Sequence, residues 1–237
     1  MGFPGFSAKA AAWFQALPDN NSRDWFQANK GTFEQEVKEP MLRLVTAIND
    51  KLVEQMPEYF LDHPGKGIFR IYRDTRFSKD KTPYKTHVSA AYERRGMNQK
   101  ASGLYFQVGA TGVGIAGGSY MPANDSLLAI RTKIASNYED FLKILSGKKL
   151  AKTMGEIQGD ALSRPPKGFA ADHPGIDLLK KKQFYFWKML PPELITSPKL
   201  EKEILSHFLV MHPALLFLDD AVLAARKKTA KVSRFLD

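Results

Sequence analysis

The first sixty residues carry apolar side chains at the spacing of α-helices. The run of residues 6–17 ends at Pro18, and a second run resumes after Gly31. Pro40 is expected to break or kink the second helix. This N-terminal part of the chain is therefore predicted to be helical. Apolar positions in the two runs are Phe6, Ala10, Trp13, Phe14, Leu17, Phe33, Val37, Met41, Leu44, Val45, Ile48 and Leu52.

The middle of the chain changes from a helical to an alternating pattern. Residues 68–77 are rich in aromatic and β-branched side chains, as expected for a strand. Further strands are predicted at 86–92, 103–108 and 113–116, and their short spacing favours an antiparallel meander. The first strand would place Arg70, Tyr72, Asp74 and Arg76 on one face and Phe69, Ile71, Arg73, Thr75 and Phe77 on the other.

The rest of the chain returns to a helical pattern. Helices are predicted over about 124–144, 200–211 and 213–226, while residues 182–188 could add a strand to the sheet. This order of elements predicts the α+β class, with an antiparallel sheet of about four to six strands flanked by N-terminal and C-terminal helices. We expect a single domain over residues 1–225 and a basic tail over 226–237.

Composition narrows the class of protein. The 237 residues are 43% hydrophobic, which is enough material for a core. The absence of cysteine excludes disulfides, thiol catalysis and cysteine-ligated metal sites. The longest apolar run, residues 210–218, is broken by His212 and Pro213, so we expect no membrane contact. Without a recognisable signal peptide, a cytoplasmic protein is the simplest interpretation.

Positive charge is unevenly distributed along the chain. The net charge is +10, and residues 66–100 hold ten basic side chains against three acidic ones. A second basic cluster lies between Arg226 and Arg234. An excess of this kind attracts polyanions without specificity, so specific binding requires a defined site.

Familiar catalytic and cofactor motifs find no support. Residues 112–117 match the G-x-G-x-x-G dinucleotide fingerprint, but no helix can begin before about Asn124. A glycine-rich hairpin strand is the favoured interpretation. Glu203 and His207 could share a helix face, although one such pair often arises by chance. No serine lies in a nucleophile elbow. We therefore predict no metal site and no cofactor.

Residues 70–87 are the strongest candidate site. Arginine offers a planar fork and lysine a point charge to phosphate or carboxylate groups. Asp74 and His87 could move a proton if a reaction occurs, and Tyr72, Phe77 and Tyr84 could stack on a ring. The alternative is a charged sheet face stabilised by weak ion pairs. The candidate ligand-binding residues are Arg70, Arg73, Arg76, Lys79, Lys81, Tyr84 and Lys85, with Arg131 and Lys167 as possible contributors.

The same segment carries a resemblance to a known family. Residues 73–87, RDTRFSKDKTPYKTH, resemble the signature of the bacterial and fungal family known as domain of unknown function 2461. Agreement with the family pattern extends to residues 5–6 with 20–26, to 120–131 and to 164–169. The resemblance reaches about residue 220 and implies one domain. The family has no established activity, so the resemblance implies no mechanism.

Two functional hypotheses remain open. In the first, residues 70–87 bind a small phosphorylated or carboxylated ligand, with or without a reaction. In the second, the basic surface binds nucleic acid or another polyanion as a non-enzymatic module. The first is preferred because the C-terminal basic cluster could be only a tail. A purely structural role is a third possibility, and the oligomeric state is left open.

Overall fold

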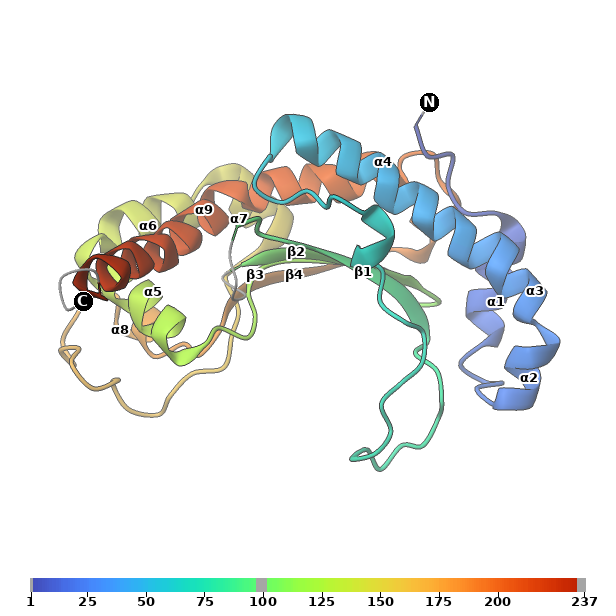
Figure 1. Ribbon diagram of the computed structural model, residues 1–237, viewed down its shortest axis with the longest axis horizontal. Coiled ribbons are helices and arrows are strands. Elements are labelled where there is room, and N and C mark those ends of the chain that lie inside the picture. Colours follow the sequence, from blue (N-terminus) through green and yellow to red (C-terminus); the bar gives the residue numbers. More distant parts are fainter. Residues whose placement is uncertain (1, 97–101, 234–237) are drawn as a thin grey trace. The chain divides into compact units, whose positions relative to one another are not determined.

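The computed structural model describes residues 2–96 and 102–233 (Figure 1). Helices α1 (Ala8–Ala16), α2 (Arg23–Ala28) and α3 (Lys30–Thr32) open the chain, and a π-helical turn, η1 (Phe33–Lys38), leads into α4 (Glu39–Gln55). Pro40 lies in the first turn of α4. The helical backbone continues from η1 into α4, with the Glu39 N–H bonded to the Glu34 carbonyl, so the missing N–H of proline is accommodated next to the wider π-type bonding. The expected interruption is thus the π-helical turn just before the proline.

The sheet has four strands in the order β1-β2-β3-β4: β1 (His87–Glu93), β2 (Gly103–Gly109), β3 (Gly112–Ser119) and β4 (Phe184–Leu190). The structure therefore confirms the α+β class, at the low end of the predicted strand number. The prediction that residues 182–188 join the sheet is also confirmed. The strand predicted over 68–77 is wrong, because that segment makes only the isolated bridges Ile68–Ala90 and Tyr72–Tyr84 within the described residues.

Strand β3 explains the apparent dinucleotide fingerprint. Its glycines belong to a strand, and α5 (Asn124–Ser136) begins only after a further turn. Gly118 has φ +133°, and a Cβ atom there would lie 2.2 Å from the carbonyl oxygen of Phe184 in β4. The glycine allows a close approach of two backbones rather than the binding of a phosphate.

The described residues fall into two compact units. Unit 1 comprises Met1–Tyr92, Tyr105–Ile115 and Lys188–Ser206, and unit 2 comprises Glu93–Leu104, Ala116–Trp187 and His207–Asp237. The single domain over residues 1–225 stays a prediction. The core of unit 1 includes the predicted apolar stripe of α4, namely Met41, Leu44, Val45, Ile48 and Leu52, and these side chains are at most 1% exposed.

Unit 2 is built around the later helices. In order these are α5, α6 (Tyr138–Leu145), α7 (Lys148–Met154), α8 (Ile176–Leu179) and the greater part of α9 (Leu200–Ser233). Asp219 of α9 is fully buried and accepts hydrogen bonds from Arg94 at 3.0 Å and from Ser102 at 2.7 Å. This ionic contact ties the segments on either side of residues 97–101 to the helix.

Helix α9 departs from its prediction. The helices expected over 200–211 and 213–226 are one helix, which continues through Pro213. Flanking residues such as Met211 and Ala214 are fully buried, and their packing offsets the hydrogen bond that the proline removes. Residues 200–227 are long and apolar enough to cross a membrane, and 56% of the apolar window is buried in the protein. Core helices of soluble proteins share this property, so α9 alone does not establish a membrane.

Candidate functional site

The candidate segment forms an arm, defined here as residues 68–86, that extends from the start of β1 (Figure 1). Its two sides are joined near the base by Lys85 N–H donating to the carbonyl of Ile71 at 2.8 Å. A second bond runs from Arg73 N–H to the carbonyl of Pro83 at 2.9 Å. The arm is therefore a loosely paired hairpin whose connecting loop has no regular structure.

Side chains of the arm alternate in exposure although the strand ladder is missing. Ile71 is buried and Arg73 and Thr75 are half-buried, whereas Arg70, Tyr72, Asp74 and Arg76 are exposed. The two predicted faces are thus reproduced between residues 70 and 76. Phe69 and Phe77 depart from the pattern, since they are 46% and 95% exposed.

Aromatic stacking holds the base of the arm. The ring of Tyr84 stacks on Phe26 of α2 with ring centres 4.1 Å apart, and Tyr72 lies 5.3 Å from Tyr84. Tyr84 is 2% exposed, and burial raises the pKa of its hydroxyl. Its ring is therefore part of the packing and is not open to a ligand, while half-exposed Tyr72 covers its outer side.

The side-chain amide of Asn21 also holds the base of the arm, through hydrogen bonds to the backbone of Tyr84. Its Nδ2 donates to the carbonyl of Tyr84 at 2.9 Å, and its Oδ1 accepts from the N–H of Tyr84 at 3.1 Å. The side chain thus supplies the two bonds that a neighbouring strand would make. Ser22 caps α2, but no local signal revealed the role of Asn21.

Replacing Asn21 with alanine should lower the free energy of unfolding by about 1–3 kcal/mol, because the part-buried backbone N–H and C=O of Tyr84 lose their partners. The arm should also be cut faster by trypsin at its exposed basic residues. Urea denaturation and limited proteolysis measure the two effects. The control is Asn20→Ala, which removes one exposed bond to the Ala16 carbonyl. Equal behaviour of the two variants would contradict the assigned role of Asn21.

Internal ion pairs fix the outer part of the arm. Arg73 donates to Asp80 and to the hydroxyl of Thr82, and Arg76 donates two bonds to Asp74, at 3.0 and 2.7 Å. Hydrogen bonds from the Thr82 N–H, Arg73 and the Thr82 hydroxyl lower the pKa of Asp80 to about 2. Hydrogen bonds from the Arg76 side chain and N–H lower the pKa of Asp74.

These contacts engage several of the predicted ligand-binding residues within the arm itself. Arg73 and Arg76 are occupied by carboxylates of the arm itself, and the Lys81 ammonium donates to the carbonyl of Thr75 at 2.9 Å. An ionised carboxylate held by arginine is a poor proton acceptor, which weakens Asp74 as a catalytic candidate. Part of the charged-face alternative, the Asp74–Arg76 pair, is present in the structure.

A different set of positive groups gathers at the base of the arm: Arg70, Lys85 and His87. Arg70 and Lys85 have no ion-pair partner among the residues that the structure describes. Burial, followed by the nearby charge of Arg70, lowers the pKa of Lys85. Burial and the charge of Lys85 lower the pKa of His87. The charge of Arg70 therefore acts on Lys85, and that of Lys85 acts on His87.

Aromatic and amide groups continue this cluster onto the sheet. The ammonium of Lys85 lies 5.3 Å from the ring centre of Phe69, and that ring lies 6.1 Å from Tyr105 of β2. The Tyr105 hydroxyl donates to Gln107 Oε1 at 2.9 Å. A Cβ added at Gly109 would lie 2.9 Å from the Cβ of His87, so the two residues are neighbours across the β1–β2 pair. His87, Tyr105 and Gln107 thus share the less buried face of the sheet.

The remaining predicted residues lie elsewhere. Lys79 is exposed near the end of the arm. Arg131 and Lys167 belong to unit 2, so they are described apart from the arm. Arg131 donates to the Lys181 carbonyl at 2.9 Å, its Nε is buried without a partner in the described chain, and burial lowers the pKa of its guanidinium. Lys167 is exposed in a turn.

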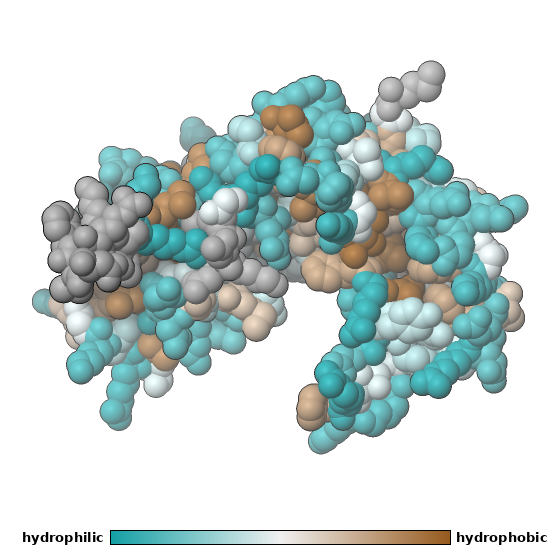
Figure 2. All heavy atoms as spheres, viewed as in Figure 1, coloured by the Kyte–Doolittle hydropathy of each residue, from teal (hydrophilic) through white to brown (hydrophobic). Residues whose placement is uncertain are grey.

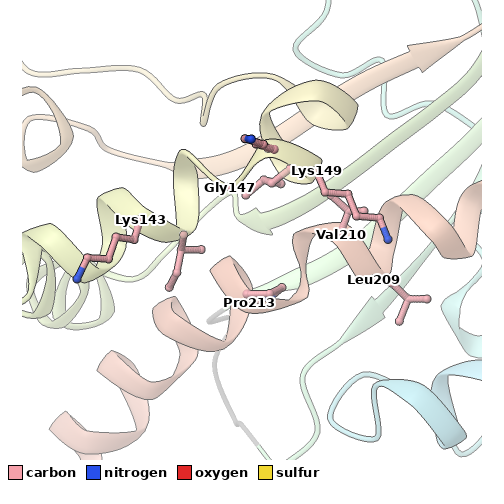
Figure 3. Close-up of a pocket in the computed structure, with 9 residues that line it drawn as sticks. Lys143, Gly147, Lys149, Leu209, Val210 and Pro213 are labelled. Carbon is pink, nitrogen blue, oxygen red and sulfur yellow. The ribbon is translucent and has the colours of Figure 1, made fainter.

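Unit 2 also contains a pocket of about 380 Å³ between α9 and the α6–α7 connection (Figure 3). Figure 3 shows Lys143 and Lys149 extending in opposite directions, so their charges do not converge on one ligand group. None of the sequence-predicted site residues lines this pocket. The lining consists of Lys143, Ile144, Gly147, Lys148, Lys149, Leu150, Leu209, Val210 and Pro213.

Within residues 2–96 and 102–233, no group of three or more histidine, aspartate or glutamate side chains could hold a metal ion.

The chain was compared with known protein families, curated proteins and solved structures. The family model described as "Conserved hypothetical protein (DUF2461)" matches residues 9–217. No curated protein and no solved structure matches the chain.

Proposed function

Because the chain belongs to the DUF2461 family of conserved hypothetical proteins, and the arm carries the segment that resembles the family signature, we propose that the base of the arm binds a small anion. The ligand group is a phosphate or a carboxylate held by Arg70 and Lys85, with His87 beside them. We name these three residues the basic cluster. Any reaction on the bound ligand lies outside this proposal.

One observation carries the proposal: the basic cluster brings positive groups together, and neither Arg70 nor Lys85 forms an ion pair with a carboxylate of the described residues, although the charge of Arg70 helps to lower the pKa of Asp74. Arg73 and Arg76 show that the arm does pair its cations where acidic residues are close. Within the described residues the Lys85 ammonium forms no hydrogen bond or ion pair, and it lies over the ring of Phe69. Repulsion between like charges costs free energy, and a bound anion would remove that cost.

Neighbouring groups suit the rest of a ligand. Phe69 is 46% exposed and offers a ring face, while Tyr105 and Gln107 add a phenol and a primary amide. The Gln107 Nε2 donates to none of the described residues, so two neutral N–H donors are open. A small organic phosphate or carboxylate with a ring or a hydroxyl would match this set of contacts.

Lys85→Met and Arg70→Met should each weaken sulfate and phosphate binding by about tenfold or more, since a charge-assisted bond contributes about 1.5–3 kcal/mol. Isothermal titration calorimetry measures the affinity, and a thermal shift measures stability. Lys85→Met should not lower the melting temperature, because its surroundings disfavour the charged form. Lys66→Met, at an exposed lysine outside the arm, is the control. Unchanged binding in both arm variants would overturn the proposal.

The same binding should depend on pH. The lowered pKa of His87 lies below its ordinary 6.5, so the imidazole is neutral at pH 7. A bound anion favours the protonated form, so the sulfate affinity should rise as the pH falls below about 6.5. Sulfate remains ionised over this range, and only protein groups contribute. His87→Gln should remove this rise while it keeps the affinity at pH 7.5.

A further inference from the structure

The end of the arm presents one almost fully exposed aromatic ring among charged side chains, three of them basic and two acidic. We define the arm tip as residues 74–81. Phe77 is 95% exposed, the largest exposure among the exposed large hydrophobic residues of the described chain. Figure 2 shows a hydrophobic patch at the free end of an otherwise hydrophilic arm. The guanidinium of Arg76 lies 5.7 Å from the ring centre, and Lys79 and Lys81 are exposed nearby in sequence.

The tip is held in shape although it has no regular structure. Arg76 forms a two-bond pair with Asp74, and Lys81 donates to the Thr75 carbonyl at 2.9 Å. These contacts hold the chain on either side of Phe77 and leave its ring open to solvent. A ring on a fixed backbone loses only its own side-chain freedom when a flat partner stacks on it.

We propose that the arm tip is a contact site for single-stranded nucleic acid, in which Phe77 stacks on one base and the surrounding cations meet the flanking phosphates. Stacking on an aromatic side chain accepts any base, because every base has a π face. The charge of Arg76 is balanced by Asp74, but its remaining N–H groups can still donate to a phosphate, since a guanidinium has five donors. Lys79 has no partner within the described residues and supplies a further charge.

The composition of the tip favours this partner over the other polyanions. A membrane surface is bound by several apolar side chains that enter the lipid together with basic residues. The tip offers one ring, and the residues around it are charged or polar. One ring with cations on both sides corresponds to one base with the phosphates before and after it. Duplex DNA would hide the base faces that the ring requires.

The direct test uses the full-length protein and fluorescein-labelled oligonucleotides of twelve thymidines. Phe77→Ala should weaken binding about 5- to 150-fold, as expected from the loss of one stacked base. Phe77→Trp should retain binding, and its added indole fluorescence should be quenched on stacking. With one or two phosphates neutralised by Lys79 and Lys81, the logarithm of the affinity should fall against the logarithm of the salt concentration with a slope of about −1. Leu128→Ala, at an exposed apolar residue of α5, is the control.

Three results would overturn this inference: no oligonucleotide binding at low salt, equal binding by Phe77→Ala, or Phe77-dependent binding to anionic vesicles without oligonucleotide binding. Oligonucleotide binding at the arm tip and anion binding at the basic cluster can be tested independently. Lys85→Met should leave the quenching of the Phe77→Trp protein in place, and Phe77→Ala should leave sulfate binding unchanged. Failure of one proposal therefore does not imply failure of the other.

Discussion

Replacing Asp219 with alanine should lower the free energy of unfolding by about 3–5 kcal/mol, because it removes a fully buried carboxylate that is paired with the largely buried guanidinium of Arg94. The Asp219 side chain is 0% exposed and that of Arg94 is 13% exposed. The Ser102 hydroxyl also loses its acceptor at 2.7 Å. Urea denaturation followed by circular dichroism measures the loss. A change below about 1 kcal/mol would show that the ion pair does not stabilise unit 2.

The next residue provides a matched control. Asp220 is 62% exposed and approaches Lys133 at 3.5 Å, so Asp220→Ala should change the stability by less than about 1 kcal/mol. A double variant separates the cost of breaking the pair from its net contribution. Arg94→Met combined with Asp219→Leu should recover much of the stability, since apolar replacements of a buried ion pair are often neutral.

Gly118→Ala should be comparably severe, with a loss of about 2–5 kcal/mol. The residue has φ +133°, and its new Cβ would lie 2.2 Å from the Phe184 carbonyl oxygen and 2.6 Å from the Tyr185 Cα. Both obstacles are backbone atoms, so β4 itself would have to move. The yield of folded protein and urea denaturation measure the effect.

Substitutions at two other glycines distinguish the cost of a positive φ from the cost of a steric clash. Gly168 has φ +88° but no atom of the described residues within 4 Å of an added Cβ, so Gly168→Ala tests the backbone conformation alone, at about 1 kcal/mol. Gly31, in helix α3, is equally open and has no positive φ. Gly31→Ala should stabilise the protein by about 0.5–1 kcal/mol. If Gly118→Ala cost no more than Gly168→Ala, the close approach of β3 and β4 would be disproved.

The sequence predicted those parts of the fold in which local pattern and final environment agree. The strands β1 and β2, the apolar stripe of α4 and the glycine-rich strand β3 are of this kind. The continuation of α9 through Pro213 could not be predicted, because a local helix breaker is overruled by packing with residues distant in sequence. The hydrogen bonds between Asn21 and Tyr84 could not be predicted either, because they join residues 63 positions apart in the sequence.

The candidate segment was located by its charge, but its internal organisation was not. Sequence alone could not divide the cations into those paired within the arm, such as Arg73, and those left open, such as Arg70. That division depends on the fold of the loop, which brings Asp80 back to Arg73. The contribution of β2 through Tyr105 was missed as well, since nothing near that residue signals a neighbour in the arm.

The two ends of the arm are stabilised by different forces, so the two ends should respond differently to salt concentration. The base rests on the stacking of Phe26, Tyr72 and Tyr84, which salt strengthens or leaves unchanged. The outer loop rests on exposed ion pairs, which lose most of their strength when the Debye length shrinks to about 3 Å at 1 M salt. Concentrated salt should therefore weaken the ion pairs of the outer loop and increase its conformational freedom. The base of the arm should stay packed on α2 under the same conditions.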